Sequence, residues 1–124
     1  MTPRPVILVV DDDAPILLLM RNLLREFGFA PVTAGGGPQA LEEARRSNPD
    51  LILLDRNMPG MTGDEVLQKL RSDGFESTPI LIVSGEPLAP DEVRRLGATG
   101  AVLKPFDVPS LVETIRGHVV AARA

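Results

Sequence analysis

The stretch VILVV at residues 6–10 runs directly into Asp11, Asp12 and Asp13, and the stretch LILL at residues 51–54 runs directly into Asp55. Neither stretch alternates apolar and polar residues, as a strand with one face in water would. Strands that are apolar throughout are typical of a parallel sheet covered on both faces by helices. We therefore expect both groups of carboxylates at the carboxyl ends of buried strands.

Three more short apolar or β-branched runs follow the same pattern, at residues 31–34, 80–83 and 101–103. Each of the five runs is followed by a segment with helical periodicity or helix-start signals. Five strands that alternate with about five helices predict a doubly wound α/β fold with a parallel sheet. The 124 residues suffice for one domain with its own core, so we expect a single domain over residues 1–124.

The first helix shows the clearest periodicity of the chain. Its apolar residues at helical spacing predict a core-facing stripe, which consists of Ile16, Leu19, Met20, Leu23, Leu24 and Phe27. Leu18 points nearly the opposite way and Leu17 lies at the edge of the stripe. This surplus of apolar surface is either a small exposed patch or a face on which a partner docks.

Composition excludes several classes of protein. The net charge is −4 and no Lys/Arg-rich run is present, which argues against a nucleic-acid surface. Cysteine is absent, the start of the chain lacks the features of a secretory signal, and the longest apolar runs are far short of the roughly 18 residues that suggest a membrane span. We expect a cytoplasmic protein that binds neither nucleic acid nor membrane.

The acidic residues at the strand ends point to a cation. If the first and third strands are neighbours, their carboxylates converge and repel one another by about 4 kcal/mol per pair at an effective dielectric constant near 20. They must then take up a proton or bind a cation, and hard oxygen ligands with open positions favour Mg²⁺. Ser84 and Lys104 follow the last two runs and would reach the same edge, where a hydroxyl and an ammonium could bind phosphate oxygens.

Four motifs in this order, VVDDD (9–13), LLDRNMPGMTG (53–63), ILIVSGE (80–86) and LKPF (103–106), resemble the receiver domain of bacterial two-component response regulators. The resemblance extends over nearly the whole chain. It implies a flavodoxin-like receiver fold with strand order 2-1-3-4-5. It also implies a regulatory phosphoacceptor, with weak phosphotransfer and autodephosphorylation activity of its own, instead of an enzyme.

The resemblance also assigns the site residues. Asp55 would be the phosphoacceptor, and Mg²⁺ would be held by Asp11, Asp12, Asp55 and the backbone carbonyl of Asn57. Ser84 and Lys104 would bind phosphoryl oxygens, and the Lys104–Pro105 bond is commonly cis in the family. Asn57 and Glu86 occupy positions that tune hydrolysis, which implies a short-lived phosphorylated state.

The partners that the resemblance implies are a histidine kinase or histidine phosphotransfer protein as donor and a downstream protein target. The chain would be a monomer or a weak dimer. Two alternatives come from other classes. An aspartyl-phosphate phosphatase of the haloacid dehalogenase type would need a second Asp where this chain has Asn57. A receiver-like module could also signal through protein contacts without phosphorylation.

The last alternative gains weight where the chain departs from the family. Many receivers carry Tyr or Phe in the last strand at the position of Ala101, and that residue responds to phosphorylation. Pro87 and Pro90 interrupt a segment that is about two residues shorter than in the chemotaxis receiver. We therefore expect a short fourth helix and a readout by loop ordering or by a shift of that helix.

Overall fold

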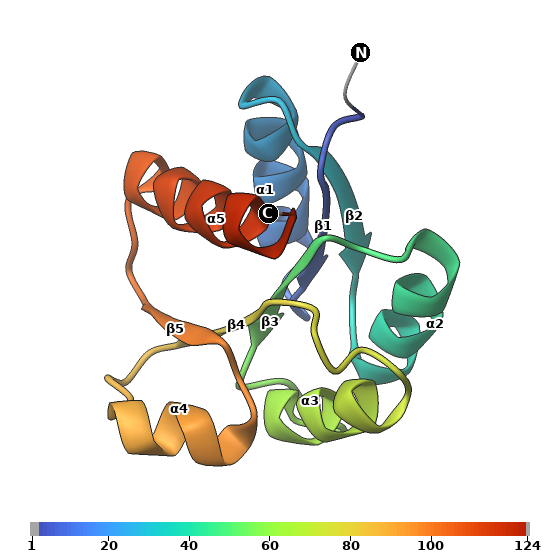
Figure 1. The fold of residues 1–124 in the computed structure, drawn as a ribbon, viewed down its shortest axis with the longest axis vertical. Helices are drawn as coiled ribbons and strands as arrows, with labels where there is room; N and C mark the ends of the chain where they lie inside the picture. The colour runs from blue at the N-terminus through green and yellow to red at the C-terminus, as the bar shows by residue number, and fades with distance from the viewer. Residues whose placement is uncertain (1–2, 124) are drawn as a thin grey trace.

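The computed structural model describes residues 3–123 and contains one parallel sheet in the order β2-β1-β3-β4-β5 (Figure 1). The prediction of a doubly wound α/β fold with this strand order is confirmed. The elements, in chain order, are β1 (Val6–Val10), α1 (Ala14–Glu26), β2 (Ala30–Ala34), α2 (Gly37–Ser47), β3 (Leu51–Asp55), α3 (Gly63–Ser72), β4 (Ile80–Ser84), α4 (Pro90–Leu96), β5 (Gly100–Leu103) and α5 (Val108–Arg123).

Each expected strand lies within one residue of its observed bounds, and the differences concern the site. Asp55 and Ser84 are the last residues of β3 and β4, not the first residues after them. Backbone hydrogen bonds extend the ladder at this point, from the Arg56 amide to the Val83 carbonyl and from the Lys104 amide to the Ser84 carbonyl. The sheet itself therefore holds these polar residues in place.

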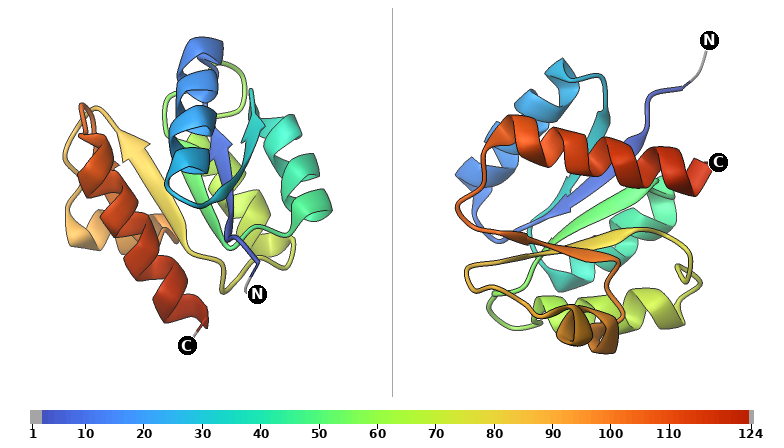
Figure 2. Two further views of the ribbon diagram at one scale, coloured as in Figure 1. Left: turned by 90° about the horizontal axis from the view of Figure 1, so that it is seen from above. Right: turned by 60° about the vertical axis from the view of Figure 1, so that its left-hand side comes forward.

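Two apolar clusters fill the space on either side of the sheet. One joins the sheet to α1 and α5, and the other joins it to α2, α3 and part of α4. The right-hand view of Figure 2 shows α1 and α5 above the sheet and α3 and α4 below it. The central strands β3 and β4 are buried along their whole length, which explains why their sequences are apolar on both faces.

The face that α1 turns to the core differs from the predicted stripe. Met20 and Leu24 are buried as expected, but Ile16 and Leu19 are exposed, and Leu19 is 53% accessible. Leu17, placed at the edge of the stripe, packs partly buried against the core. The prediction was wrong because residues 16–20 are all apolar, so that helical periodicity alone does not select one face.

Phe27, at the end of the predicted stripe, is also exposed, and Leu23 is only partly buried. Leu18 is 59% accessible, so the expectation that it points away from the core is confirmed. The exposed apolar residues of this region are therefore Ile16, Leu18, Leu19 and Phe27.

Aspartate side chains cap two of the helices, and the fourth helix is short, as predicted. Asp13 caps α1 by accepting from the Ile16 amide, and Asp107 accepts from the Ser110 amide at the start of α5. α4 is short, with seven residues, and ends at Gly97 in the left-handed region. Over residues 3–123, no helix is long and apolar enough to cross a membrane.

Candidate functional site

The carboxyl ends of β1 and β3 bring three carboxylates together. The two strands are neighbours, with Val10 opposite Leu54, so Asp11 and Asp12 follow one strand beside the Asp55 that ends the other. One carboxylate oxygen from each of the three lies within 4.8 Å of the others. Asp11 and Asp55 are buried and Asp12 is exposed, so the cluster opens to solvent on one side. The predicted convergence is confirmed.

Lys104 brings a positive charge to the phosphoacceptor candidate from two strands away. It follows β5, and its Nζ donates to Oδ1 of Asp55 over 3.2 Å. The Asp55 side chain is only 5% accessible, and the Lys104 ammonium gives this buried carboxylate a partner of opposite charge. The Lys104–Pro105 bond is cis, as expected.

Ser84 reaches the same edge, but its hydroxyl is occupied by its own loop. Its Oγ donates to the Glu86 carbonyl over 2.9 Å and accepts from the Glu86 amide over 3.1 Å. A hydroxyl has one proton, so Ser84 can donate to a phosphoryl oxygen only if it releases the Glu86 carbonyl. Asn57 is exposed and lines, with Ser84 and Glu86, a hollow of about 480 Å³.

Burial and charge both act on Asp11. Burial raises the pKa of the Asp11 carboxyl above its ordinary value of 3.8, and the nearby Asp55 carboxylate raises it further. The hydrogen bond from the Asp13 amide, 3.0 Å long, and the Lys104 ammonium oppose this rise in pKa. A divalent cation would relieve the repulsion between the carboxylates. Three carboxylates with one open side are the oxygen donors that Mg²⁺ prefers.

This arrangement of residues matches a known family. The family model described as the response regulator receiver domain matches residues 7–116. The chain belongs to this family. Receiver domains are the phosphoacceptor switches of two-component systems, in which they interact with histidine kinases.

Individual relatives agree with the assignment of this receiver. It is 39% identical over 120 residues to the DNA-binding response regulator MtrA of Mycobacterium tuberculosis, and the match covers 95% of this chain and 52% of MtrA. The sensory transduction protein RegX3 of Mycolicibacterium smegmatis is 37% identical over 112 residues, which cover 89% of this chain and 48% of RegX3. The receiver thus spans about half the length of these relatives.

Two solved structures match the receiver over nearly their full length. The chemotaxis protein CheY4 of Vibrio cholerae has a TM-score of 0.85 and 34% identity, with 92% of this chain and 98% of CheY4 covered. The response regulator TrrA of Thermotoga maritima, solved with Mg²⁺ and a beryllium fluoride, has a TM-score of 0.81 and 31% identity, with 92% of this chain and 98% of TrrA covered.

Gly63 is a residue of the receiver site that the sequence analysis missed. It is the first residue of α3, and a Cβ atom there would lie 2.3 Å from the Asp55 carbonyl oxygen and 2.7 Å from the Arg56 Cα. The Gly63 amide also donates to the Arg56 carbonyl over 3.0 Å. The chain therefore returns directly onto the backbone of Asp55, and only glycine fits there. The Thr62-x-x-Glu65 capping box, which locates the start of α3, was visible in the sequence.

Arg56 is the second missed residue. Its Nε and Nη2 donate to the two carboxylate oxygens of Asp64 over 3.1 and 3.2 Å, and Nη2 also contacts Glu92 of α4 over 3.4 Å. No local sequence pattern predicts the contact between Arg56 and Glu92, because the two residues are 36 positions apart. Arg56, which directly follows Asp55 in the chain, is thus bonded to α3 through Asp64 and to α4 through Glu92.

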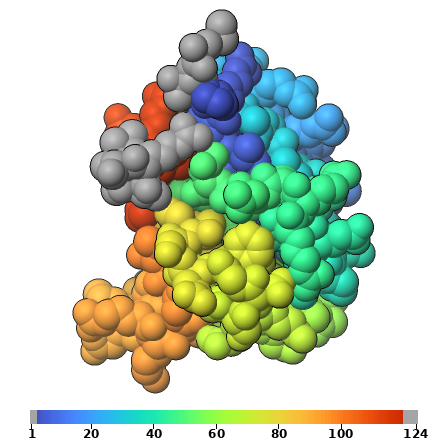
Figure 3. Space-filling view, turned by 45° about the vertical axis from the view of Figure 1, so that its right-hand side comes forward, coloured from blue at the N-terminus to red at the C-terminus, as the bar shows by residue number. Residues whose placement is uncertain are grey.

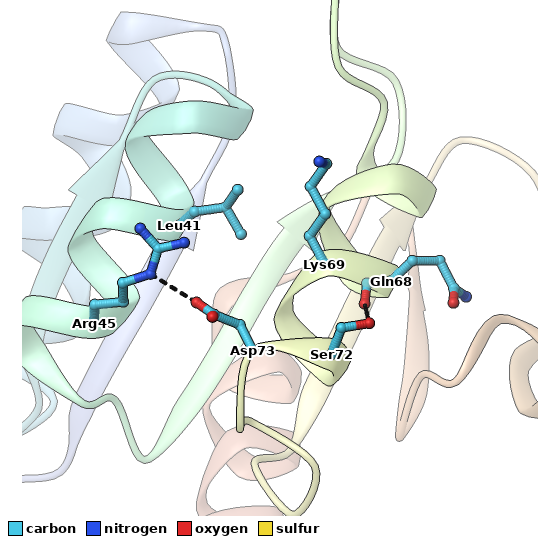
Figure 4. A pocket seen from close by; sticks show the side chains of 6 residues that line it. All are labelled: Leu41, Arg45, Gln68, Lys69, Ser72 and Asp73. Atoms are coloured by element: carbon cyan, nitrogen blue, oxygen red, sulfur yellow. Dashed lines mark hydrogen bonds and ion pairs between the residues drawn. The ribbon is translucent and has the colours of Figure 1, made fainter.

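A separate hollow of about 320 Å³ lies between α2 and α3, as Figure 4 shows. Arg45 and Asp73 form an ion pair across it, with 2.7 Å between Nε and Oδ2. Arg45 lies in the last turn of α2 and Asp73 directly follows α3, and these ends of the helices are remote from the carboxyl ends of the strands. We assign this hollow no part in the receiver site.

Proposed function

We propose that this receiver accepts a phosphoryl group on Asp55, with Mg²⁺ held by the carboxylates of Asp11, Asp12 and Asp55 and by the backbone carbonyl of Asn57. The observation that carries the proposal is the contact between the Lys104 ammonium and the buried Asp55, directly beside two further carboxylates. Charge neutralisation and in-line positioning are the main requirements of phosphoryl transfer. A module that signals only through protein contacts would have no need of this charged, buried cluster.

In this proposal a carboxylate oxygen of Asp55 attacks the phosphorus of a phosphohistidine or of acetyl phosphate. The new O–P bond forms while the bond to the leaving group breaks, and the leaving group keeps the electron pair. Lys104 donates to one phosphoryl oxygen and Ser84 to another. Bound Mg²⁺ supplies further neutralisation of the phosphoryl charge.

We also propose that the phosphorylated state is short-lived. Asn57 and Glu86 line the hollow beside Ser84, where water can approach the acyl phosphate. Both side chains are polar and exposed, so neither shields the phosphoryl group from solvent. The resulting autodephosphorylation is a property of the switch and needs no separate catalytic base.

The proposed phosphodonor is a histidine kinase or histidine phosphotransfer protein, which docks against the exposed apolar residues of α1. Ile16 and Leu19 are one helical turn apart, share a face and are both exposed, whereas the exposed Leu18 lies on another side of the helix. α1 begins three residues after Asp11, so a helix docked on this face lies close to the carboxylates. We place the partner here because a single exposed apolar residue is ordinary, whereas Ile16 and Leu19 are exposed side by side on one face.

Residues 1–124 act in this proposal as one receiver domain, in the cytoplasm, as a monomer or weak dimer with a downstream protein target. Its net charge of −4 gives no support for DNA binding by this domain itself.

Leu19→Glu tests the docking face. We expect transfer from a histidine kinase that phosphorylates the unchanged chain to slow at least about tenfold, because a carboxylate in an apolar contact must be desolvated. Phosphorylation by acetyl phosphate should keep its rate. Leu103→Glu is the control, since Leu103 is similarly exposed but lies on β5. Equal slowing by both variants, or by neither, would remove α1 from the proposal.

The phosphorylation itself is tested by intact-mass analysis after incubation with acetyl phosphate and Mg²⁺. We expect a gain of one phosphoryl group that disappears with EDTA and in Asp55→Asn. Because rapid hydrolysis could hide the product, beryllofluoride binding is measured in parallel, for example from the amide chemical shifts of Asp55 and its neighbours. If neither phosphorylation nor beryllofluoride binding occurs, the phosphorylation-independent module becomes the better description.

A further inference from the structure

Helix α4 is attached to the domain less firmly than the other helices. It contributes no buried residue, and Figure 3 shows its segment, in orange, standing out from the body of the molecule. The apolar contacts of this region come from Leu88 before the helix and from Leu96 and Ala98 at its end, all of them only partly buried. Packing alone therefore holds the helix weakly.

The C-terminal end of α4 is fastened to α3 by hydrogen bonds. Gln68 donates to the Leu96 carbonyl over 3.1 Å, and the Nε of Arg71 donates to the Gly97 carbonyl over 3.0 Å. Arg71 also binds the carbonyls of Phe75 and Thr78, so it is itself firmly held. This end of the helix is an anchored point about which the other end could move.

The N-terminal end has a single fastening of this kind. Among residues 3–119, the Arg56–Glu92 ion pair is the only side-chain hydrogen bond or ion pair that joins the first turn of α4 to another element. Asp91, in the same turn, pairs only with Arg94 of the same helix. Arg56 is a rigid support, because its amide is bonded to Val83 and its guanidinium grips Asp64.

The loop before α4 is held by a hydrogen bond from the Ser84 hydroxyl, which in the proposed phosphorylated state donates to a phosphoryl oxygen instead. Ser84 donates its one proton to the Glu86 carbonyl, and it must release that carbonyl to donate to a phosphoryl oxygen. The segment 85–89 then loses one of its restraints. The Arg56–Glu92 ion pair does not involve Ser84, so it persists and opposes any displacement of the helix start.

We propose that the Arg56–Glu92 ion pair is a latch that holds the N-terminal end of α4 in its unphosphorylated position and sets how readily phosphorylation displaces this helix. The inference rests on the proposed function of Asp55. It supplies a readout for a chain that has the small, exposed Ala101 in β5 and so lacks an aromatic side chain there. The latch connects the two sites directly, because Arg56 follows Asp55 in the chain and Glu92 belongs to α4.

The size of the effect follows from the exposure of the pair. The side chains of Arg56 and Glu92 are 25% and 36% accessible, so solvent screens their attraction in part. We expect Glu92→Gln to raise the apparent affinity for beryllofluoride in the presence of Mg²⁺ by roughly two- to fivefold, because the activated state no longer has to break the ion pair. It should also raise hydrogen exchange of the Val93 amide, whose bond to the Ala89 carbonyl closes the first turn of α4, in the unphosphorylated chain.

Asp91→Asn is the matched control. It removes the same charge from the same helical turn, with the same loss of interaction with the helix dipole, but it leaves Arg56 untouched. We expect a smaller rise in exchange than in Glu92→Gln, and wild-type beryllofluoride affinity, because the ion pair to Arg56 remains. Both quantities are compared for the native chain and the two variants under identical conditions.

Equal exchange and equal affinity in Glu92→Gln and Asp91→Asn would overturn the latch. If both variants still gain a phosphoryl group from acetyl phosphate, that result leaves the proposed function intact. If instead no form of the chain is phosphorylated or binds beryllofluoride, the proposed function fails. The exchange comparison needs no phosphodonor and shows in that case whether the ion pair restrains α4.

Discussion

Replacing Gly63 with alanine is expected to slow phosphorylation by acetyl phosphate about a hundredfold and to lower the free energy of unfolding by about 1–3 kcal/mol. An alanine Cβ at this position would lie 2.3 Å from the Asp55 carbonyl oxygen, and backbone cannot yield as a flexible side chain does. The start of α3 must therefore move away from the end of β3. Because Asp55 is the last residue of that strand, its carboxylate moves with it.

Gly117→Ala provides the comparison for Gly63→Ala. Gly117 lies inside α5, and a Cβ there meets nothing within 4 Å. Alanine should stabilise this helix by about 0.5–1 kcal/mol without changing the phosphorylation rate. The measurements are urea unfolding and the rate of mass gain with acetyl phosphate. Wild-type rate and stability in Gly63→Ala would show that the close approach to Asp55 is unimportant.

Replacing Asp11 with asparagine is expected to abolish the stabilisation of the folded chain by Mg²⁺. For one proposed site at a Mg²⁺ concentration a hundred times its Kd, the native chain should gain about 2.7 kcal/mol. The variant loses one of the three carboxylates that converge here. In EDTA, however, the same variant should be about 1 kcal/mol more stable than the native chain at neutral pH, because it no longer buries a charge beside Asp55.

The pH dependence of this difference has a defined sign. The pKa of Asp11 in the folded chain lies above the ordinary 3.8, so the folded state binds the proton more tightly than the unfolded state. The ionised Asp11 therefore destabilises the folded chain to its full extent above the raised pKa, and this destabilisation disappears as the pH falls toward 3.8. The advantage of Asp11→Asn in EDTA should disappear over the same window, which unfolding curves at several pH values would record.

Asp13→Asn distinguishes the carboxylate cluster from the general acidity of the segment. Asp13 lies two residues from Asp11, but it caps α1 and is absent from the group of converging carboxylates. Asparagine is an equally good cap, so stability should change little and the response to Mg²⁺ should persist. Loss of the Mg²⁺ response in both variants would mean that the ion is held by diffuse negative charge instead of by the proposed site.

Both proposals depend on the same short region of backbone. Asp55 ends β3, Arg56 carries the contact to Glu92, and Gly63 returns the chain onto both. A phosphoryl group on Asp55 would thus act at one end of a segment whose other contacts reach the start of α3 and α4. This closeness explains how a receiver without an aromatic residue at Ala101 could still transmit its state.

The sequence by itself determined the layer architecture and the membership of the acidic site. The apolar runs of β1, β3 and β4 lack alternation, as is typical of strands buried on both faces, and parallel strands place their carboxyl ends at one edge. Asp11, Asp12, Asp55 and Lys104 could therefore be grouped before any coordinates were known. The caps at Asp13 and Asp107 can also be recognised in the sequence, because a cap depends on residues no more than three positions away.

Only the tertiary structure decided which face of α1 is buried, because five consecutive apolar residues at 16–20 offer several equivalent faces and the docking on the sheet selects one. It also decided the roles of Gly63 and Arg56. The first follows from a close approach between backbones, and the second from an ion pair between residues 36 positions apart. Such contacts depend on how finished elements are placed relative to one another, and local sequence patterns carry no information about that placement.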